Sequence, residues 1–232
     1  MKKKVIALAL GCTVAFGCAV GGTLAWLIDT TTEVKNTFTT SDISITLEET
    51  TGNEYNEYKM VPGDTFAKDP KVTVEKGSEE CWLFVKVTEN EGSWSALTDK
   101  NGKDIDVLGD LIKYTIASGW IGVPDHDGYY YRTVSANAEN QPFYILAGTS
   151  PYTNGQITID DSVTKTMMEM IDGKNADGTT NNNEQKPTLT FTAAAIQKAN
   201  LDYPDGATTD DEKVATAWAQ LPAAFTDAAQ GE

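Results

Sequence analysis

Histidine and cysteine are scarce in this chain, which has one His and three Cys among its 232 residues. A single histidine, His126, cannot supply the two imidazoles of the H-E-x-x-H zinc-protease helix, and that motif is absent from the sequence. The G-x-S-x-G elbow of serine hydrolases and the phosphate-binding Walker loop are absent as well. These absences predict that the protein is not an enzyme.

The cysteine positions also argue against a disulfide framework. Cys12 and Cys18 lie in the apolar N-terminal segment, so removal of that segment would leave only Cys81. One cysteine cannot form an internal disulfide, and stability would then depend on a hydrophobic core. Cys81 lies in an alternating apolar stretch, which favours a buried, inert thiol over a catalytic dyad with His126.

Basic residues are outnumbered, with 18 Lys and Arg against 34 Asp and Glu. Residues 1–25 contain three of the lysines and no acid, so a chain without them would keep 15 basic residues and carry a net charge of 15 − 34 = −19. Such a surface repels nucleic acid and anionic membranes, and we expect no nucleic-acid partner. It favours solubility outside the cell and could attract divalent cations or basic partners.

The first 25 residues have the pattern of a signal peptide. Three lysines precede an apolar stretch over residues 5–20, and Thr23 and Ala25 are the small residues that signal peptidase accepts before its cleavage site. We predict cleavage between Ala25 and Trp26, a secreted protein of the extracellular matrix or cell surface, and membrane contact only through the uncleaved precursor. Residues 5–28 could also span ~30 Å of hydrocarbon, so an uncleaved anchor is the alternative.

Strand patterns dominate the remaining chain. Ile43, Ile45 and Leu47 alternate with polar residues, and residues 81–88 alternate between two largely apolar faces, as expected of a central strand. Further strands are predicted over residues 72–74, 111–121, 129–134, 143–146, 156–159 and 188–194. The pattern predicts a mainly β protein, an antiparallel β-sandwich with a few short helices, one of them near the C-terminus.

That helix begins with a capping box, in which Glu212 follows Thr209 by three residues. Its apolar residues recur at helical spacing, and we expect this face to pack on the sandwich. Residues 167–171, rich in Met, are predicted to be core, and residues 173–187 a mobile polar loop. The apolar residues of the helix are Val214, Ala217, Trp218 and Leu221, and Pro222 ends it.

Two acidic loops are candidate calcium sites, because calcium prefers six to eight oxygen ligands. The first contains Asp99, Asn101, Asp104 and Asp106, and the second Asp172, Asn175 and Asp177. Neither has the register of an EF-hand, and each includes a lysine that opposes a cation. We therefore predict no cofactor, with calcium at the first loop as the alternative.

Aromatic residues offer a different function. Trp94, Trp120, Tyr129, Tyr130 and Tyr131 could form an aromatic platform. A platform of this kind would make the protein a cell-surface adhesin, or a β-sandwich module that binds a glycan or a protein. The competing interpretation is that alternating aromatics on strands belong to the core.

Several motifs together resemble the TasA–camelysin family, secreted proteins of Gram-positive bacteria whose signal peptides are cut by a SipW-type signal peptidase. The N-terminal match consists of GGTLA at residues 21–25, WLID at 26–29, TF at 37–38 and the first alternating strand. A second block has VPGD at residues 61–64 and LFVKV at 83–87. Pattern similarity extends over most of the chain.

The resemblance implies a jelly-roll domain over residues 41–232 that polymerises into extracellular biofilm-matrix fibres. In such fibres a freed N-terminal segment, here residues 26–40, lies as a donor strand in the next subunit. The partner would be a second copy in a head-to-tail homopolymer, with other matrix proteins or polysaccharide as further partners. Taken alone, the segment could equally be the domain's own first strand or a tail.

The metalloprotease activity attributed to some family members is not expected of this protein, because no zinc ligand set is recognisable in its sequence. The apolar anchors of the donor would be Trp26, Leu27, Ile28, Val34 and Phe38.

Overall fold

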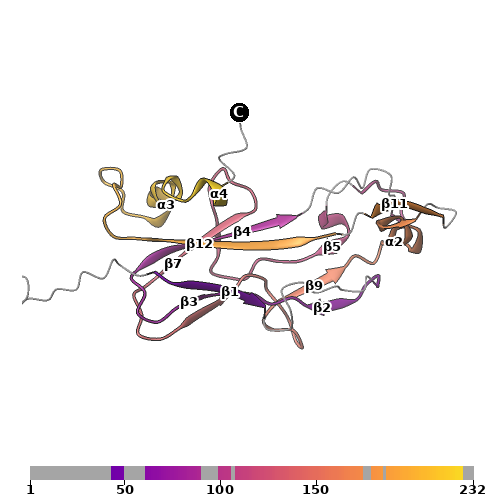
Figure 1. Ribbon diagram of the computed structural model, residues 1–232, viewed down its shortest axis with the longest axis horizontal. Helices are drawn as coiled ribbons and strands as arrows, with labels where there is room; N and C mark the ends of the chain where they lie inside the picture. Colours follow the sequence, from indigo (N-terminus) through magenta and orange to yellow (C-terminus); the bar gives the residue numbers. More distant parts are fainter. Residues whose placement is uncertain are drawn as a thin grey trace, which may run out of the picture. The chain divides into compact units, whose positions relative to one another are not determined.

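The computed structural model describes residues 43–49, 61–89, 99–105, 108–174, 179–184 and 187–226 (Figure 1). All of them belong to one compact unit, Ser41–Glu232. In this part of the chain no helix is long and apolar enough to cross a membrane. The predicted signal peptide, the Ala25–Trp26 cleavage site and the donor residues Leu27, Ile28, Val34 and Phe38 lie outside the described residues.

Two three-stranded sheets follow one another on one side of the core. The first has the order β1 (Ile45–Glu49), β3 (Pro70–Val74) and β8 (Gln141–Tyr144). The second has the order β2 (Thr65–Ala67), β9 (Gln156–Ile159) and β5 (Ile112–Lys113). Hydrogen bonds from Ile145 N to Pro70 O and from Lys68 N to Gly155 O extend the pairing between them.

A four-stranded sheet lies on the other side of the core. Its order is β12 (Leu189–Gln197), β4 (Cys81–Glu89), β7 (Tyr129–Val134) and β6 (Ile121–Gly122), with every pair antiparallel. The predicted mainly β architecture with antiparallel sheets is therefore confirmed, as is the central position of the strand predicted over residues 81–88. Short helices complete the fold: η2 (Leu108–Asp110), α2 (Lys165–Ile171), α3 (Asp210–Ala219) and α4 (Ala223–Thr226).

Strand β4 separates two cores because its side chains alternate between the two faces of the sheet. Leu83 and Val85, both 0% exposed, face the main core between the sheets. Trp82 and Phe84, also 0% exposed, face a second core under helices α3 and α4. Figure 1 shows these two helices beside β12 and β4.

Helix α3 forms as predicted. The Glu212 backbone N–H donates to Thr209 Oγ1 at 3.4 Å, and the Thr209 N–H donates to Glu212 Oε2 at 2.9 Å, which completes the capping box. Val214 and Ala217 are fully buried, and the Trp218 ring packs against Phe84 with ring centroids 6.0 Å apart. The Met-rich segment is helix α2, and its Met167 and Ile171 are buried in the main core, as expected of core residues.

Two predictions of local structure need correction. The strand predicted over residues 111–121 is broken into β5, an isolated bridge at Ile116 and β6, because Gly119 has a φ of +87° in the turn that precedes β6. The segment 173–187, predicted to be a loop, contains part of a short hairpin. In that hairpin β10 (Asp172–Lys174) pairs with β11 (Thr180–Glu184).

Candidate functional site

The outer edge of β12 is the most unusual surface of the described strands. Its nine residues pair with β4 along the whole length, from Leu189 opposite Glu89 to Gln197 opposite Cys81. On the opposite side, no described strand pairs with β12. Its sequence, LTFTAAAIQ, has no charged residue and no proline. Natural proteins usually protect sheet edges with charge, proline or short length, so an edge of this kind is suited to pairing with another chain.

The other sheet edges among the described residues lack this combination. Strand β1 carries Glu48 and Glu49, and β8 has four residues, one of which is Pro142. Strands β2, β5 and β6 are two or three residues long. Length and lack of charge therefore distinguish β12 as the candidate site.

The core-facing side chains of β12 are incompletely covered. Leu189, Phe191, Ala193 and Ala195 are partly buried against the main core, whereas Leu83 on the neighbouring β4 is 0% exposed. A further strand beside β12 would remove more of this apolar surface from water, a favourable change of roughly 25 cal/mol per Å². The site thus offers apolar contact area beside a strand edge with which no described strand pairs.

The opposite face of β12 changes character along the strand. Thr190 and Thr192 are exposed, whereas Ala194 and Ile196 are partly buried against the core under α3 and α4. A strand added to this edge would therefore meet solvent beside the first half of β12. Beside the second half it would meet apolar side chains.

An ion pair borders the edge near Phe191. Lys68 Nζ lies 2.8 Å from Glu49 Oε1, with side-chain exposures of 12% and 9%, and 5.6 Å from the centre of the Phe191 ring. These three residues come from separate segments on both sides of the core. Sequence reasoning missed the ion pair because no local pattern connects these segments.

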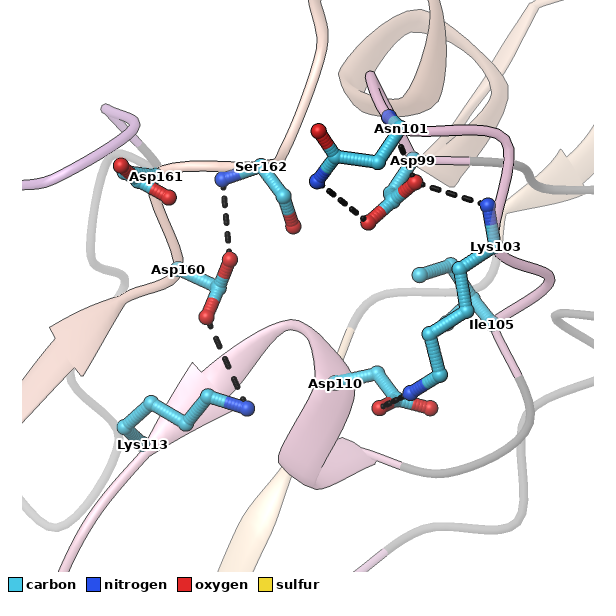
Figure 2. Close-up of a pocket in the computed structure, with 9 residues that line it drawn as sticks. All are labelled: Asp99, Asn101, Lys103, Ile105, Asp110, Lys113, Asp160, Asp161 and Ser162. Atoms are coloured by element: carbon cyan, nitrogen blue, oxygen red, sulfur yellow. Dashed lines mark hydrogen bonds and ion pairs between the residues drawn. The ribbon is translucent and has the colours of Figure 1, made fainter.

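The first candidate calcium loop lines a polar hollow of about 190 Å³ (Figure 2). Asp99 accepts hydrogen bonds from the backbone N–H groups of Asn101, at 2.7 Å, and Lys103, at 2.8 Å. These donors, that of Lys103 foremost, hold the pKa of Asp99 below its ordinary value. The hollow is lined by Asp99, Asn101, Lys103, Ile105, Asp110, Lys113, Asp160, Asp161 and Ser162.

Protein groups already neutralise the other carboxylates of the hollow. Asp110 is paired with Lys103, Asp161 lies 3.3 Å from Lys100 Nζ, and Asp160 lies 3.5 Å from Lys113 Nζ. Hydrogen bonds from Ser162, assisted by Lys113, lower the pKa of Asp160. The arrangement is a network of ion pairs within the chain.

The described residues of the first loop do not come together as the calcium ligands considered from the sequence. The Asn101 side chain turns its amide Nδ2 toward Asp99, at 3.3 Å, and exposed Asp104 does not line the hollow. Asp106 lies outside the described residues, as do Asn175 and Asp177 of the second loop. Across the described ranges, no three His, Cys, Asp or Glu side chains are grouped as potential metal ligands.

The aromatic platform is not formed by the residues described. Trp120 is 8% exposed and its Nε1 donates to the Tyr144 carbonyl at 2.8 Å. Tyr129 and Tyr131 are buried as well, and Tyr130 is partly buried. Trp94 lies outside the described residues. These tyrosines and Trp120 therefore contribute to packing, and do not present a flat binding surface.

Cys81 and His126 lie in different surroundings. Cys81 is 0% exposed in the main core, where burial raises the pKa of its thiol to about 11. His126 stacks on Trp218 of α3, with ring centroids 4.2 Å apart. The structure thus places Cys81 in a core and His126 against the helical layer, which does not create a nucleophile–base pair.

No family model, curated protein or solved structure matches this chain.

Proposed function

We propose that this protein is a secreted structural subunit that assembles head to tail into extracellular biofilm-matrix fibres by strand donation. In this proposal the donor segment, residues 26–40 of one copy, adds a strand to the outer edge of β12 in the next copy. The observation that carries the proposal is the long, uncharged outer edge of β12, with which no described strand pairs. The resemblance to the TasA–camelysin family supports it, and the jelly-roll topology belongs to the same proposal.

Both partners of such a contact have suitable chemistry. The donor segment contains apolar residues and several threonines, which favour extended backbone. The acceptor is a strand edge with which no described strand pairs, beside a partly covered core. Strand addition combines main-chain hydrogen bonds, which give affinity, with side-chain contacts, which give specificity.

The geometry of the contact leads to fibres. Donor and acceptor are different surfaces of the same chain, so the contact is heterologous, and a heterologous contact that does not close into a ring generates a filament. Removal of residues 1–25 would be the assembly switch, because an attached signal peptide tethers the donor to the membrane. A precursor that formed the same fibres with residues 1–25 attached would contradict the switch.

Electron microscopy of two purified proteins tests the proposal. One begins at Trp26, and the other begins at Thr37 and lacks most of the donor segment. We expect filaments from the longer protein alone, with the same circular dichroism spectrum for both as a control for folding. Monomers from both proteins would refute the fibre function. They would instead favour an adhesin or ligand-binding module that does not need the segment.

A further inference from the structure

The core-facing side of β12 has a gradient of side-chain size. It begins with two large residues, Leu189 and Phe191, and continues with two small ones, Ala193 and Ala195. All four are partly buried and face the main core. A strand added to this edge would therefore find little space beside the first half of β12 and more space beside the second half.

The donor segment has the complementary gradient when it is considered as an extended strand. Successive side chains of a strand point to opposite faces. The even-numbered face begins with two large apolar residues, Trp26 and Ile28, and continues with the smaller Thr30 and Thr32. The odd-numbered face carries Leu27 and is then polar at Asp29, Thr31 and Glu33.

We infer that the donor strand of a second copy runs antiparallel to β12, in a register that places Trp26 opposite Ala195. This inference rests on the proposed function and specifies its contact. The large donor residues then lie beside the small acceptor residues. The core-facing pairs are Trp26 with Ala195, Ile28 with Ala193, Thr30 with Phe191 and Thr32 with Leu189.

The second face of the donor matches in the same register. Leu27 lies opposite Ala194, which is partly buried against the core under α3 and α4. Asp29 and Thr31 lie opposite Thr192 and Thr190, which are both exposed. Leu27, the one apolar residue on this face of the donor, thus contacts the apolar second half of β12. The carboxylate of Asp29 stays in water.

Other registers lose one of these matches. An antiparallel shift of two residues in one direction places Leu27 opposite exposed Thr192, and the opposite shift places Asp29 opposite partly buried Ala194. A parallel strand that begins opposite Leu189 brings Glu33 beside Ile196, which is partly buried. A shift of one residue turns the polar face of the donor toward the core.

A size exchange between donor and acceptor tests the pairing in the protein that begins at Trp26. Ala195→Leu fills the space opposite Trp26, and we expect the critical concentration for filament formation to rise about tenfold or more. Adding Trp26→Ala to that variant should restore most of the loss. Thr88→Leu, which adds similar bulk on the exposed face of β4 and lies outside the proposed contact, is the matched control and should assemble normally. Thermal unfolding of each variant separates loss of assembly from loss of folding.

Paired cysteines test the register directly. The double variant Thr31→Cys with Thr190→Cys should give a ladder of disulfide-linked multimers under mild oxidation, because these residues lie opposite each other. The pairs Thr31→Cys with Thr192→Cys and Asp29→Cys with Thr190→Cys are offset by two residues and should give far less. Cys81 does not interfere, because it is buried.

The outcomes separate this inference from the proposed function. Wild-type filaments with a ladder from an offset pair, or without rescue by Trp26→Ala, would overturn the register and leave the fibre function standing. An intramolecular disulfide in a monomer would show that the segment pairs within its own copy. Absence of filaments from the wild-type protein would overturn both.

Discussion

Replacement of Phe84 by alanine tests whether α3 and α4 are an integral part of the fold. Phe84 is 0% exposed on the face of β4 that is turned away from the main core. Its ring lies 6.3 Å from that of Tyr131 and 6.0 Å from that of Trp218. The substitution therefore removes the ring that joins the sheet to the helical layer.

The expected loss is large, because Phe→Ala in a core costs about 3–5 kcal/mol from lost transfer free energy and the cavity that remains. A shift of roughly 2–4 °C in melting temperature per kcal/mol is typical for a domain of this size, so we expect a melting temperature lower by about 6–20 °C. Urea unfolding, followed by circular dichroism and by tryptophan fluorescence, measures the free energy. Trp82 and Trp218, two of the five tryptophans, lie in the core under the helices and contribute its signal to the fluorescence, whereas circular dichroism follows the whole domain.

A loss below about 1 kcal/mol would refute the reasoning, since it would mean that the helices contribute little to stability. Thr192→Ala is the control, because Thr192 is exposed on β12 and surface substitutions usually change stability by less than about 0.5 kcal/mol. Separate transitions for fluorescence and circular dichroism in the wild-type protein would show that the helical layer unfolds independently, and would also contradict the argument.

Three further predictions concern individual side chains. Backbone N–H groups of Thr209 and Thr208 lower the pKa of Glu212 from 4.5 to about 2. Its stabilising effect is therefore present above pH 4.5 and is lost as the pH falls through about 2. The melting-temperature difference between wild type and Glu212→Gln should be constant near neutrality and vanish near pH 2; a difference that persists at pH 2 would contradict it. The pKa of Cys81 is raised from 9.0 to about 11, so its thiolate fraction at pH 8 should be about 100-fold below that of the unfolded chain. In the protein that begins at Trp26, where Cys81 is the single cysteine, burial and the raised pKa should together make labelling by a thiol reagent at least about 100-fold slower without denaturant than with it; equal rates would refute this. Lys68→Met leaves the largely buried Glu49 without its ion pair and should cost about 3 kcal/mol or more in urea unfolding. The double variant with Glu49→Leu should recover part of this loss, and a double variant worse than the single would argue against the ion pair.

The strands could be predicted where the alternation of residue type along the sequence matches the alternation of buried and exposed side chains in the structure. Strand β4 shows its two faces in the sequence because both are apolar, and strand β7 follows a turn in which Gly128 has a φ of +78°. The prediction over residues 111–121 was wrong because hydrophobic content alone does not reveal a turn. There Gly119 lies in a turn with a φ of +87°, and the segment pairs only in short pieces, at β5, at the Ile116 bridge and at β6.

The surroundings of the polar hollow could not be predicted from the sequence. The acidic loop at Asp99 is visible, but its lysine and serine neighbours come from other segments, near Lys113 and Ser162. A local count of oxygen ligands made calcium the alternative to no cofactor, and it did not show the hydrogen-bond donors and lysines that the fold brings to these carboxylates. The aromatic residues show the same limit. The sequence gives their positions, but the fold buries Trp120 in the main core and Tyr129 and Tyr131 in the core under α3 and α4.

The acidic composition and the uncharged edge of β12 fit one mode of assembly. With 34 acidic and 18 basic residues, two copies repel each other in most orientations, which opposes unspecific aggregation. At physiological ionic strength this repulsion is screened beyond about 8 Å, so it does not prevent contact where both partners lack like charges. Strand β12 has no acidic side chain along its length. The first three residues of the predicted mature chain, Trp26, Leu27 and Ile28, have none either. The proposed contact therefore joins the parts of two copies that repel each other least, and directional strand pairing then limits growth to one dimension.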